Sequence, residues 1–151
     1  MTTFESLLAE DGPIDRVEVS FARATIAKLR RAGRPVLPPL ELDALIDTGA
    51  DTSLIEHGLL TQFVREGMEL SAVVPVNAPG LGGFSWHPQF VAGLRVKHPT
   101  GPRSLDLVLP ATELVERPFG PTGFQVLIGR DILAQCRFVY DGLAGTFSIT
   151  Y

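Results

Sequence analysis

A short apolar run that ends in one acidic residue constrains this chain more than any other feature. Residues 44–46 (Ala-Leu-Ile) lead into Asp47, and Thr48 and Gly49 follow at once. An ionised carboxylate beside a core strand costs free energy unless it is paired or hydrogen-bonded. A carboxylate, a hydroxyl and a glycine in this order therefore indicate a polar site at the end of a buried strand.

The composition indicates a folded, globular protein. The chain has 151 residues, of which 45% are hydrophobic and 20% charged, so it can bury a sizeable core. We expect a single domain that spans residues 1–151. The net charge of -4 gives no reason to expect nucleic acid or an anionic membrane as a partner. A basic cluster is the exception, and we interpret it as a solvated turn: Lys28, Arg30, Arg31 and Arg34.

The cysteine count and the N-terminus bear on the cellular location. Cys136 is the only cysteine, so no intrachain disulfide can form, and we expect a buried, inert thiol. Residues 1–12 contain acidic side chains and no basic region before their short apolar patch, unlike a signal peptide. No apolar run approaches the roughly 18 residues that a membrane-spanning helix needs. The expected location is the cytoplasm.

Glycine and proline divide the chain into short segments, which favours strands and turns. The apolar spacing at 56–66 predicts one helix, ended by Gly67, and 131–135 predicts a single helical turn. We expect residues 22–29 to continue the first strand. The expected strands are 16–21, 40–46, 70–76, 84–96, 105–109, 125–128, 138–140 and 146–151.

Two further motifs accompany the Asp47 loop. The first is Val126-Leu127-Ile128-Gly129-Arg130-Asp131, three apolar residues and a glycine before a charged pair. The second is a glycine-rich hairpin tip at 79–83, between two strand-like segments. A helix does not follow these glycines, so they are no dinucleotide-binding fingerprint.

Taken together and in this order, the three motifs resemble those of the retropepsins, the retroviral-type aspartic proteases. The resemblance runs from about Val17 to the C-terminus, and the Ile-Gly-Arg-Asp segment makes it considerably more specific. It implies an all-β, single-domain closed β-barrel of the acid-protease type with one short-to-medium helix. The chain is longer than the minimal viral members, with extra residues before Val17, around 56–66 and at 97–123.

The resemblance also implies roles for individual residues. Thr48 would hydrogen-bond across to its counterpart in a second subunit, and Asp51 and Arg130 would form an ion pair that supports the site. The hairpin tip would be the flap that closes over substrate. The implied catalytic residues are Asp47, Thr48 and Gly49; the substrate-binding residues are Ala50, Asp51, Gly80, Leu81, Gly82 and Gly83; the residues that support the site are Ile128, Gly129 and Arg130.

A single Asp-Thr-Gly triplet predicts a homodimer. Hydrolysis by an activated water needs one carboxylate to accept a proton and one carboxylic acid to donate one. Two carboxyl groups about 3 Å apart share a proton, as aspartic proteases illustrate. One chain supplies only Asp47, whereas two copies related by a twofold axis supply the pair. We therefore expect an obligate homodimer that cleaves peptide or protein substrates without a cofactor.

Other interpretations stay open at this point. Fold is not activity, so the chain could be a catalytically silent dimer that binds peptides. Phe84 and Trp86 share one face of a strand and would line a substrate pocket, join the core or contact the second subunit. We expect no metal site and interpret the following as structural or surface residues: His57, His87, His98, Ser53 and Ser85.

Overall fold

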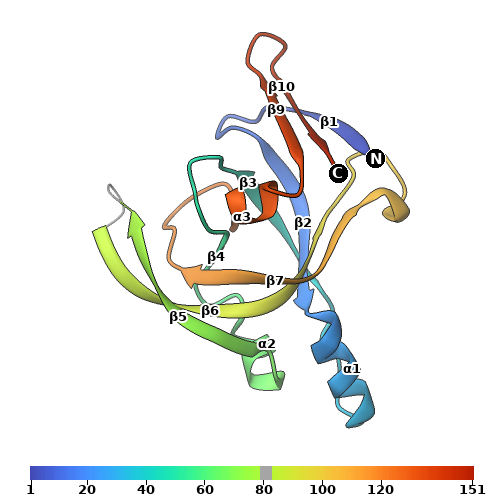
Figure 1. Ribbon diagram of the computed structural model, residues 1–151, viewed down its shortest axis with the longest axis vertical. Helices are drawn as coiled ribbons and strands as arrows, with labels where there is room; N and C mark the ends of the chain where they lie inside the picture. Colours follow the sequence, from blue (N-terminus) through green and yellow to red (C-terminus); the bar gives the residue numbers. More distant parts are fainter. Residues whose placement is uncertain (79–82) are drawn as a thin grey trace.

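Six strands close into a ring that holds most of the core (Figure 1). The computed structural model describes residues 1–78 and 83–151. The ring runs β2-β3-β8-β4-β7-β6 and closes where β6 pairs back onto β2, so the prediction of a closed all-β barrel is confirmed. Its strands are β2 (Ile14–Phe21), β3 (Leu40–Ile46), β4 (Leu54–Glu56), β6 (Gly83–Val96), β7 (Leu107–Arg117) and β8 (Val126–Ile128).

The position of β8 organises the loop that follows β3. β8 pairs with β3 in parallel, with Ile46 opposite Ile128, and pairs with β4 on its other side. The connection from β3 to β4, residues 47–53, must therefore pass over the end of β8. The two motifs that the sequence places about 80 residues apart, around Asp47 and around Gly129, meet here.

The barrel core follows the predicted alternation along β2. Val17, Val19 and Phe21 are all buried, and the Phe21 ring packs against that of Phe63 with 4.9 Å between their centroids. Glu18 lies between them and is also buried, which the alternation did not predict.

A long hairpin extends from one side of the barrel (Figure 1). β5 (Glu69–Ala78) pairs with β6 and lies outside the ring, with Asn77 opposite Phe84 and Pro75 opposite Trp86. Both strands were predicted from the sequence. Of the predicted hairpin tip, Gly80, Leu81 and Gly82 lie outside the described residues, and Gly83 begins β6.

A second, three-stranded sheet joins the two ends of the chain. β1 (Thr3–Leu7) pairs with β10 (Thr146–Thr150), which pairs with β9 (Arg137–Asp141). The β9–β10 hairpin was predicted. β1 was not, because its apolar residues are too few to signal a strand; Phe4 alone anchors it in the core.

The helices differ most from expectation. Residues 22–29 do not continue β2: the helix α1 (Arg23–Arg31) begins there and buries Thr25 and Leu29, four residues apart on one face. The expected single helix is therefore one of three short α-helices in the described chain, and none of them is long and apolar enough to span a membrane. The other two are α2 (Thr61–Glu66), shorter than predicted but ended by Gly67 as expected, and α3 (Arg130–Leu133).

β7 is longer than predicted. The sequence suggested that Pro110 ends a strand at 105–109, whereas a 3₁₀ turn (Arg103–Leu105) precedes β7, and β7 continues through Pro110 to Arg117. Proline lacks a backbone N–H and is tolerated at bulges. The β6–β7 register shifts between Ala92 and Leu94, beside this proline, which explains how the strand accommodates it.

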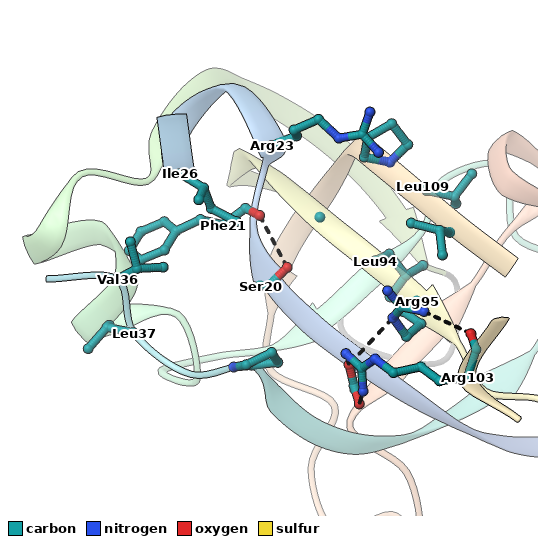
Figure 2. A pocket seen from close by; sticks show the side chains of 15 residues that line it. Ser20, Phe21, Arg23, Ile26, Val36, Leu37, Leu94, Arg95, Arg103 and Leu109 are labelled. Carbon is teal, nitrogen blue, oxygen red and sulfur yellow. Dashed lines mark hydrogen bonds and ion pairs between the residues drawn. The ribbon is translucent and has the colours of Figure 1, made fainter. Parts of the chain in front are cut away.

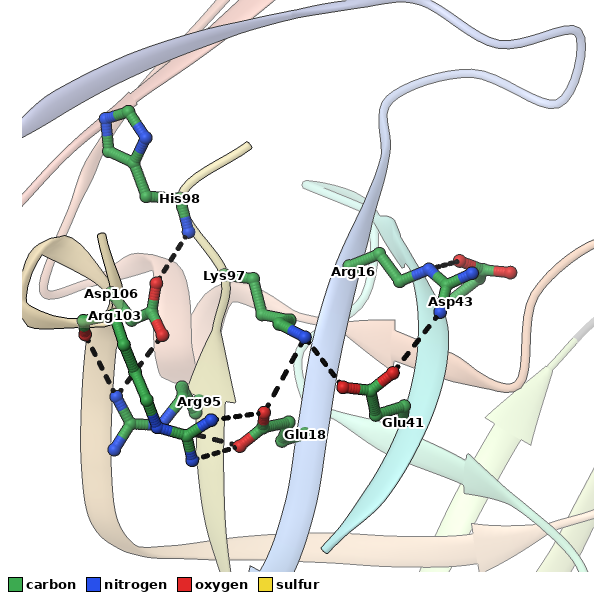
Figure 3. A network of polar contacts seen from close by, with 9 residues as sticks. All are labelled: Arg16, Glu18, Glu41, Asp43, Arg95, Lys97, His98, Arg103 and Asp106. Atoms are coloured by element: carbon green, nitrogen blue, oxygen red, sulfur yellow. Dashed lines mark hydrogen bonds and ion pairs between the residues drawn. The ribbon is translucent and has the colours of Figure 1, made fainter. Parts of the chain in front are cut away.

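A buried carboxylate ties three strands to the segment before β7 (Figure 3). Glu18 accepts two hydrogen bonds from the Arg103 guanidinium, both at 2.7 Å, and lies 3.6 Å from Nε of Arg95, its cross-strand partner on β6. On its other side, Glu18 faces Glu41 of β3. The Lys97 ammonium lies between these two carboxylates, 3.7 Å from Glu18 and 2.7 Å from Glu41, and offsets the repulsion between them.

Candidate active site

Backbone hydrogen bonds hold the Asp47 loop in one conformation. The Asp47 N–H donates to the Ile128 carbonyl at 2.9 Å, which joins the loop to the end of β8. The Gly49 N–H donates to Oδ1 of Asp47 at 2.8 Å, and the Ala50 N–H donates to the Asp47 carbonyl at 3.2 Å. These bonds form an Asx-type turn that orients the half-buried Asp47 carboxylate.

Two glycines allow the chain to approach itself closely here. A Cβ atom at Gly49 would lie 3.1 Å from Oδ1 of Asp47, closer than an ordinary contact. A Cβ atom at Gly129 would lie 2.8 Å from the carbonyl carbon of Thr52 and 3.0 Å from the carbonyl oxygen of Ala50. Since these are backbone atoms that a side chain cannot displace cheaply, Gly129 is required by the close packing of the two motifs.

A buried serine, Ser53, braces the loop through hydrogen bonds to the exposed Asp131 and to Gly129. Ser53 is fully buried, and its Oγ donates to Oδ1 of Asp131 at 2.7 Å while accepting from the Gly129 N–H at 2.9 Å. The Ser53 N–H donates to the other carboxylate oxygen at 3.0 Å. From the sequence, Ser53 was expected to be a structural or surface residue, and Asp131 was given no role. The one available signal was an acidic residue at the start of a helical turn.

The brace yields a stability prediction. Ser53→Ala would leave the Gly129 N–H and the Asp131 carboxylate without their buried partner, which costs about 1–3 kcal/mol of unfolding free energy. Urea denaturation would measure this, with Ser71→Ala as the control, because Ser71 is exposed and its hydroxyl donates only to the Gln89 carbonyl. Equal losses in the two variants would contradict the bracing role.

The predicted ion pair between Asp51 and Arg130 is formed within one chain. The backbone N–H of Arg130 also donates to the Ala50 carbonyl at 2.8 Å. Both side chains of the pair are largely exposed in the single chain, and exposed pairs add little stability. Thr48 and Gly49 are exposed beside them, whereas Ile128 is buried.

A cavity of about 600 Å³ opens above the loop. From the loop, Asp47, Gly49, Ala50 and Asp51 line it, so four of the sequence-predicted site residues share one wall. The facing wall is the β5–β6 hairpin, with Pro75, Val76, Asn77 and Phe84. The arrangement places a carboxylate and a turn of exposed backbone on one side of a cleft, with a two-stranded hairpin on the other.

Phe84 and Trp86 do not join the core of this chain. Both side chains are about 60% exposed, and their rings meet edge to face at 5.9 Å. Phe84 lines the cavity, which leaves the substrate-pocket and dimer-contact interpretations open.

The remaining candidate residues take structural partners. Nδ1 of His57 lies 3.0 Å from Oε1 of Glu116, and Oγ of Ser85 lies 2.6 Å from Nε2 of His87. Cys136 is half-buried rather than fully buried, and this burial raises the pKa of its thiol. No group of three or more His, Cys, Asp or Glu side chains in the described ranges is arranged to hold a metal ion.

A second cavity, of about 310 Å³, lies between β2, α1 and the β6–β7 pair (Figure 2). Ile26, Val36 and Leu37 form an apolar side, and Arg95 and Arg103 reach its opposite end. It contains none of the sequence-predicted site residues, and both arginines are already engaged with Glu18.

Comparison with known proteins gives a fold assignment. No model of a known protein family matches the sequence, and no curated protein matches it either. Among solved structures, the chain is similar to the crystal structure of a retropepsin-like aspartic protease from Rickettsia conorii, with a TM-score of 0.51 and 11% sequence identity. The match covers 99% of this chain and 90% of the other. The protein therefore has the retropepsin-like fold that its motifs predicted.

Proposed function

We propose that this protein is an aspartic endopeptidase that acts as a homodimer, with one Asp47 from each subunit. The observation that carries the proposal is the Asp47 carboxylate, which the Gly49 N–H orients on the wall of a 600 Å³ cleft opposite a two-stranded hairpin. The retropepsin-like fold supports it, since a solved protein of that fold is described as an aspartic protease.

The chemistry requires the second copy. One Asp47 carboxylate accepts a proton from water, which attacks the peptide carbonyl, and the other donates a proton to the carbonyl oxygen. Paired carboxyl groups at a twofold axis share one proton and can fill both roles. Thr48 and Gly49 lie exposed beside Asp47, where a symmetry mate would meet them.

The cleft suits an extended peptide. β5 and β6 offer a hairpin that can close over a bound chain, and Ala50 and Asp51 offer backbone and carboxylate groups on the opposite wall. Closure would exclude water other than the nucleophile from the reacting bond.

Asp47→Asn tests the proposal. The asparagine keeps an oxygen that can accept the Gly49 N–H but cannot share a proton, so cleavage of a diverse peptide library should be lost from acid to neutral pH. Sedimentation would show whether the variant is still dimeric. The control is Glu10→Gln, which removes an exposed carboxylate elsewhere and should cleave like the wild type.

Other outcomes would point elsewhere. Cleavage that survives Asp47→Asn would contradict the aspartic mechanism. A dimeric wild type that binds peptides but cleaves none would replace the proposal with that of a silent, peptide-binding dimer.

A further inference from the structure

A serine and a histidine face each other on β6. Oγ of Ser85 lies 2.6 Å from Nε2 of His87, which is two residues further along the strand and therefore on the same face. Both residues are half-buried, and neither is among the described residues that line the Asp47 cavity. The proposed peptidase chemistry does not use this pair, so any reactivity of the pair is separate from it.

A second hydrogen bond fixes the proton on the imidazole. Beyond the last β6–β7 pair, Gln89 with Val115, the His87 ring forms a hydrogen bond with the backbone of Glu116. This bond favours the protonated ring, which means that the ring donates and the Glu116 carbonyl accepts. Because Nε2 faces Ser85, the donor is the other nitrogen, Nδ1. A neutral imidazole has only one N–H, so Nε2 is the acceptor and the Ser85 hydroxyl donates to it.

The surroundings keep this imidazole neutral at neutral pH. Burial lowers the pKa of His87 below its ordinary value, and the nearby Arg117 and His57 lower it further. A hydroxyl that donates to a neutral imidazole, which is itself held through its second nitrogen, has the arrangement that activates serine nucleophiles. Ser71 on β5 provides the contrast, because its hydroxyl donates to the Gln89 carbonyl, which cannot take up the proton.

We propose that Ser85 is a nucleophile that accepts an acyl group from activated esters, with His87 as its general base. Oγ attacks the acyl carbon while Nε2 accepts the hydroxyl proton; the bond from that carbon to the leaving oxygen then breaks, and the imidazolium gives the proton to the leaving group. Water repeats these steps on the acyl-serine and releases the carboxylic acid.

The surroundings of the pair also define the class of substrate. A nucleophile and a base suffice for esters with a good leaving group, whereas amides also demand stabilisation of the oxyanion. On β5, Val76 lies opposite Ser85 and Val74 lies opposite His87, so both valines share the face of the pair. These neighbours favour small apolar acyl groups over charged ones.

Covalent labelling of the wild-type protein tests the proposal. One sample is treated with nitrophenyl acetate and another with an alkyl fluorophosphonate, which loses fluoride when a serine oxygen attacks its phosphorus. Mass spectrometry of peptides then locates the modified residue. We expect Ser85 to react roughly a hundredfold faster than Ser71, the effect of a positioned general base. The rate should rise with pH as His87 loses its proton and level off by neutral pH, since the pKa of His87 lies below its ordinary value.

Variants of His87 separate general-base catalysis from a structural contact. In His87→Gln the amide can still hydrogen-bond to Ser85 but cannot take up its proton, so labelling should fall by roughly a hundredfold. His87→Ala should recover part of the rate when free imidazole is added, which a structural role does not predict. Ser71→Ala is the control and should leave labelling of Ser85 unchanged. Circular dichroism shows whether each variant is folded.

Three results would overturn the proposal. They are equal labelling of Ser85 and Ser71 in the wild type, a wild-type rate in folded His87→Gln, and modification confined to residues other than Ser85. If neither variant of His87 folds, the wild-type ratio of labelling and its pH profile decide the question. Peptide cleavage, present or absent, leaves this result unaffected, because the adduct on Ser85 is identified directly.

Discussion

Replacing Asp15 with asparagine is expected to remove a loss of stability that this carboxyl contributes between pH 4 and pH 7. Asp15 lies on β2 and is only 7% exposed. Its Oδ1 accepts the Arg16 N–H at 2.8 Å, and its Oδ2 has no hydrogen-bond partner among the described residues. Burial raises the pKa of this carboxyl from 3.8 to about 7, and the nearby Asp106 adds to the rise while the Arg16 hydrogen bond opposes it.

The direction follows from proton binding in the two states. Between pH 3.8 and about 7, the folded protein keeps the Asp15 proton that the unfolded chain has released. The Asp15 contribution to stability is therefore greatest below pH 3.8 and falls by about 1.4 kcal/mol per pH unit as the pH rises through this window, on the order of 4 kcal/mol in all. Asparagine does not titrate, so its variant lacks this contribution.

Unfolding free energies at half-unit pH intervals would measure the slope. Glu5→Gln serves as the control, because it removes an exposed carboxylate and should leave the slope unchanged. Lys97 and His98 line the same cavity of about 400 Å³ as Asp15 and are present in every variant, so the difference between slopes isolates Asp15. Parallel curves for the wild type and Asp15→Asn would contradict the prediction.

The barrel could be predicted from the sequence because its signals are local. Alternation identified β2 through Val17, Val19 and Phe21, and the glycine-rich tip separated two strands that do pair as β5 and β6. The Asp47 motif combines an apolar strand with a required turn, and four of its residues line the cleft, whereas the Gly129 motif holds that loop through backbone hydrogen bonds. At residues 22–29 the short apolar pattern fits both a strand and a helix, and the prediction of a continued strand was wrong.

The residues that the sequence did not reveal depend on contacts across the fold. Ser53 and Asp131 are 78 positions apart, and Glu18 and Arg103 are 85 apart. Neither pair has a local spacing that distinguishes it from surface residues. Arg117 was not identified from the sequence either, because a charged residue at the end of a strand is normally expected to be exposed. The closed barrel instead leaves it only 4% exposed in the lining of the cleft.

Glu18→Ala is expected to destabilise the protein by about 1.5–3 kcal/mol, the usual contribution of hydrogen bonds to a charged group. Glu18 is 5% exposed, and three cations converge on its carboxylate: Arg95, Lys97 and Arg103 (Figure 3). Without it, Arg95 keeps Asp106 at 3.3 Å, but Arg103 loses both of its 2.7 Å hydrogen bonds. Urea denaturation at neutral pH would measure the loss.

Glu41→Ala provides the matched control, because Glu41 lies directly opposite Glu18 on β3 and shares Lys97 with it. Its side chain is about half exposed, so water replaces its contacts and the loss should be much smaller. In an Arg103→Ala background, Glu18→Ala should cost less than in the wild type, since the bidentate contact is already gone. Equal losses of unfolding free energy for Glu18→Ala and Glu41→Ala would contradict the prediction, because they would show that the burial of Glu18 does not strengthen its ion pairs.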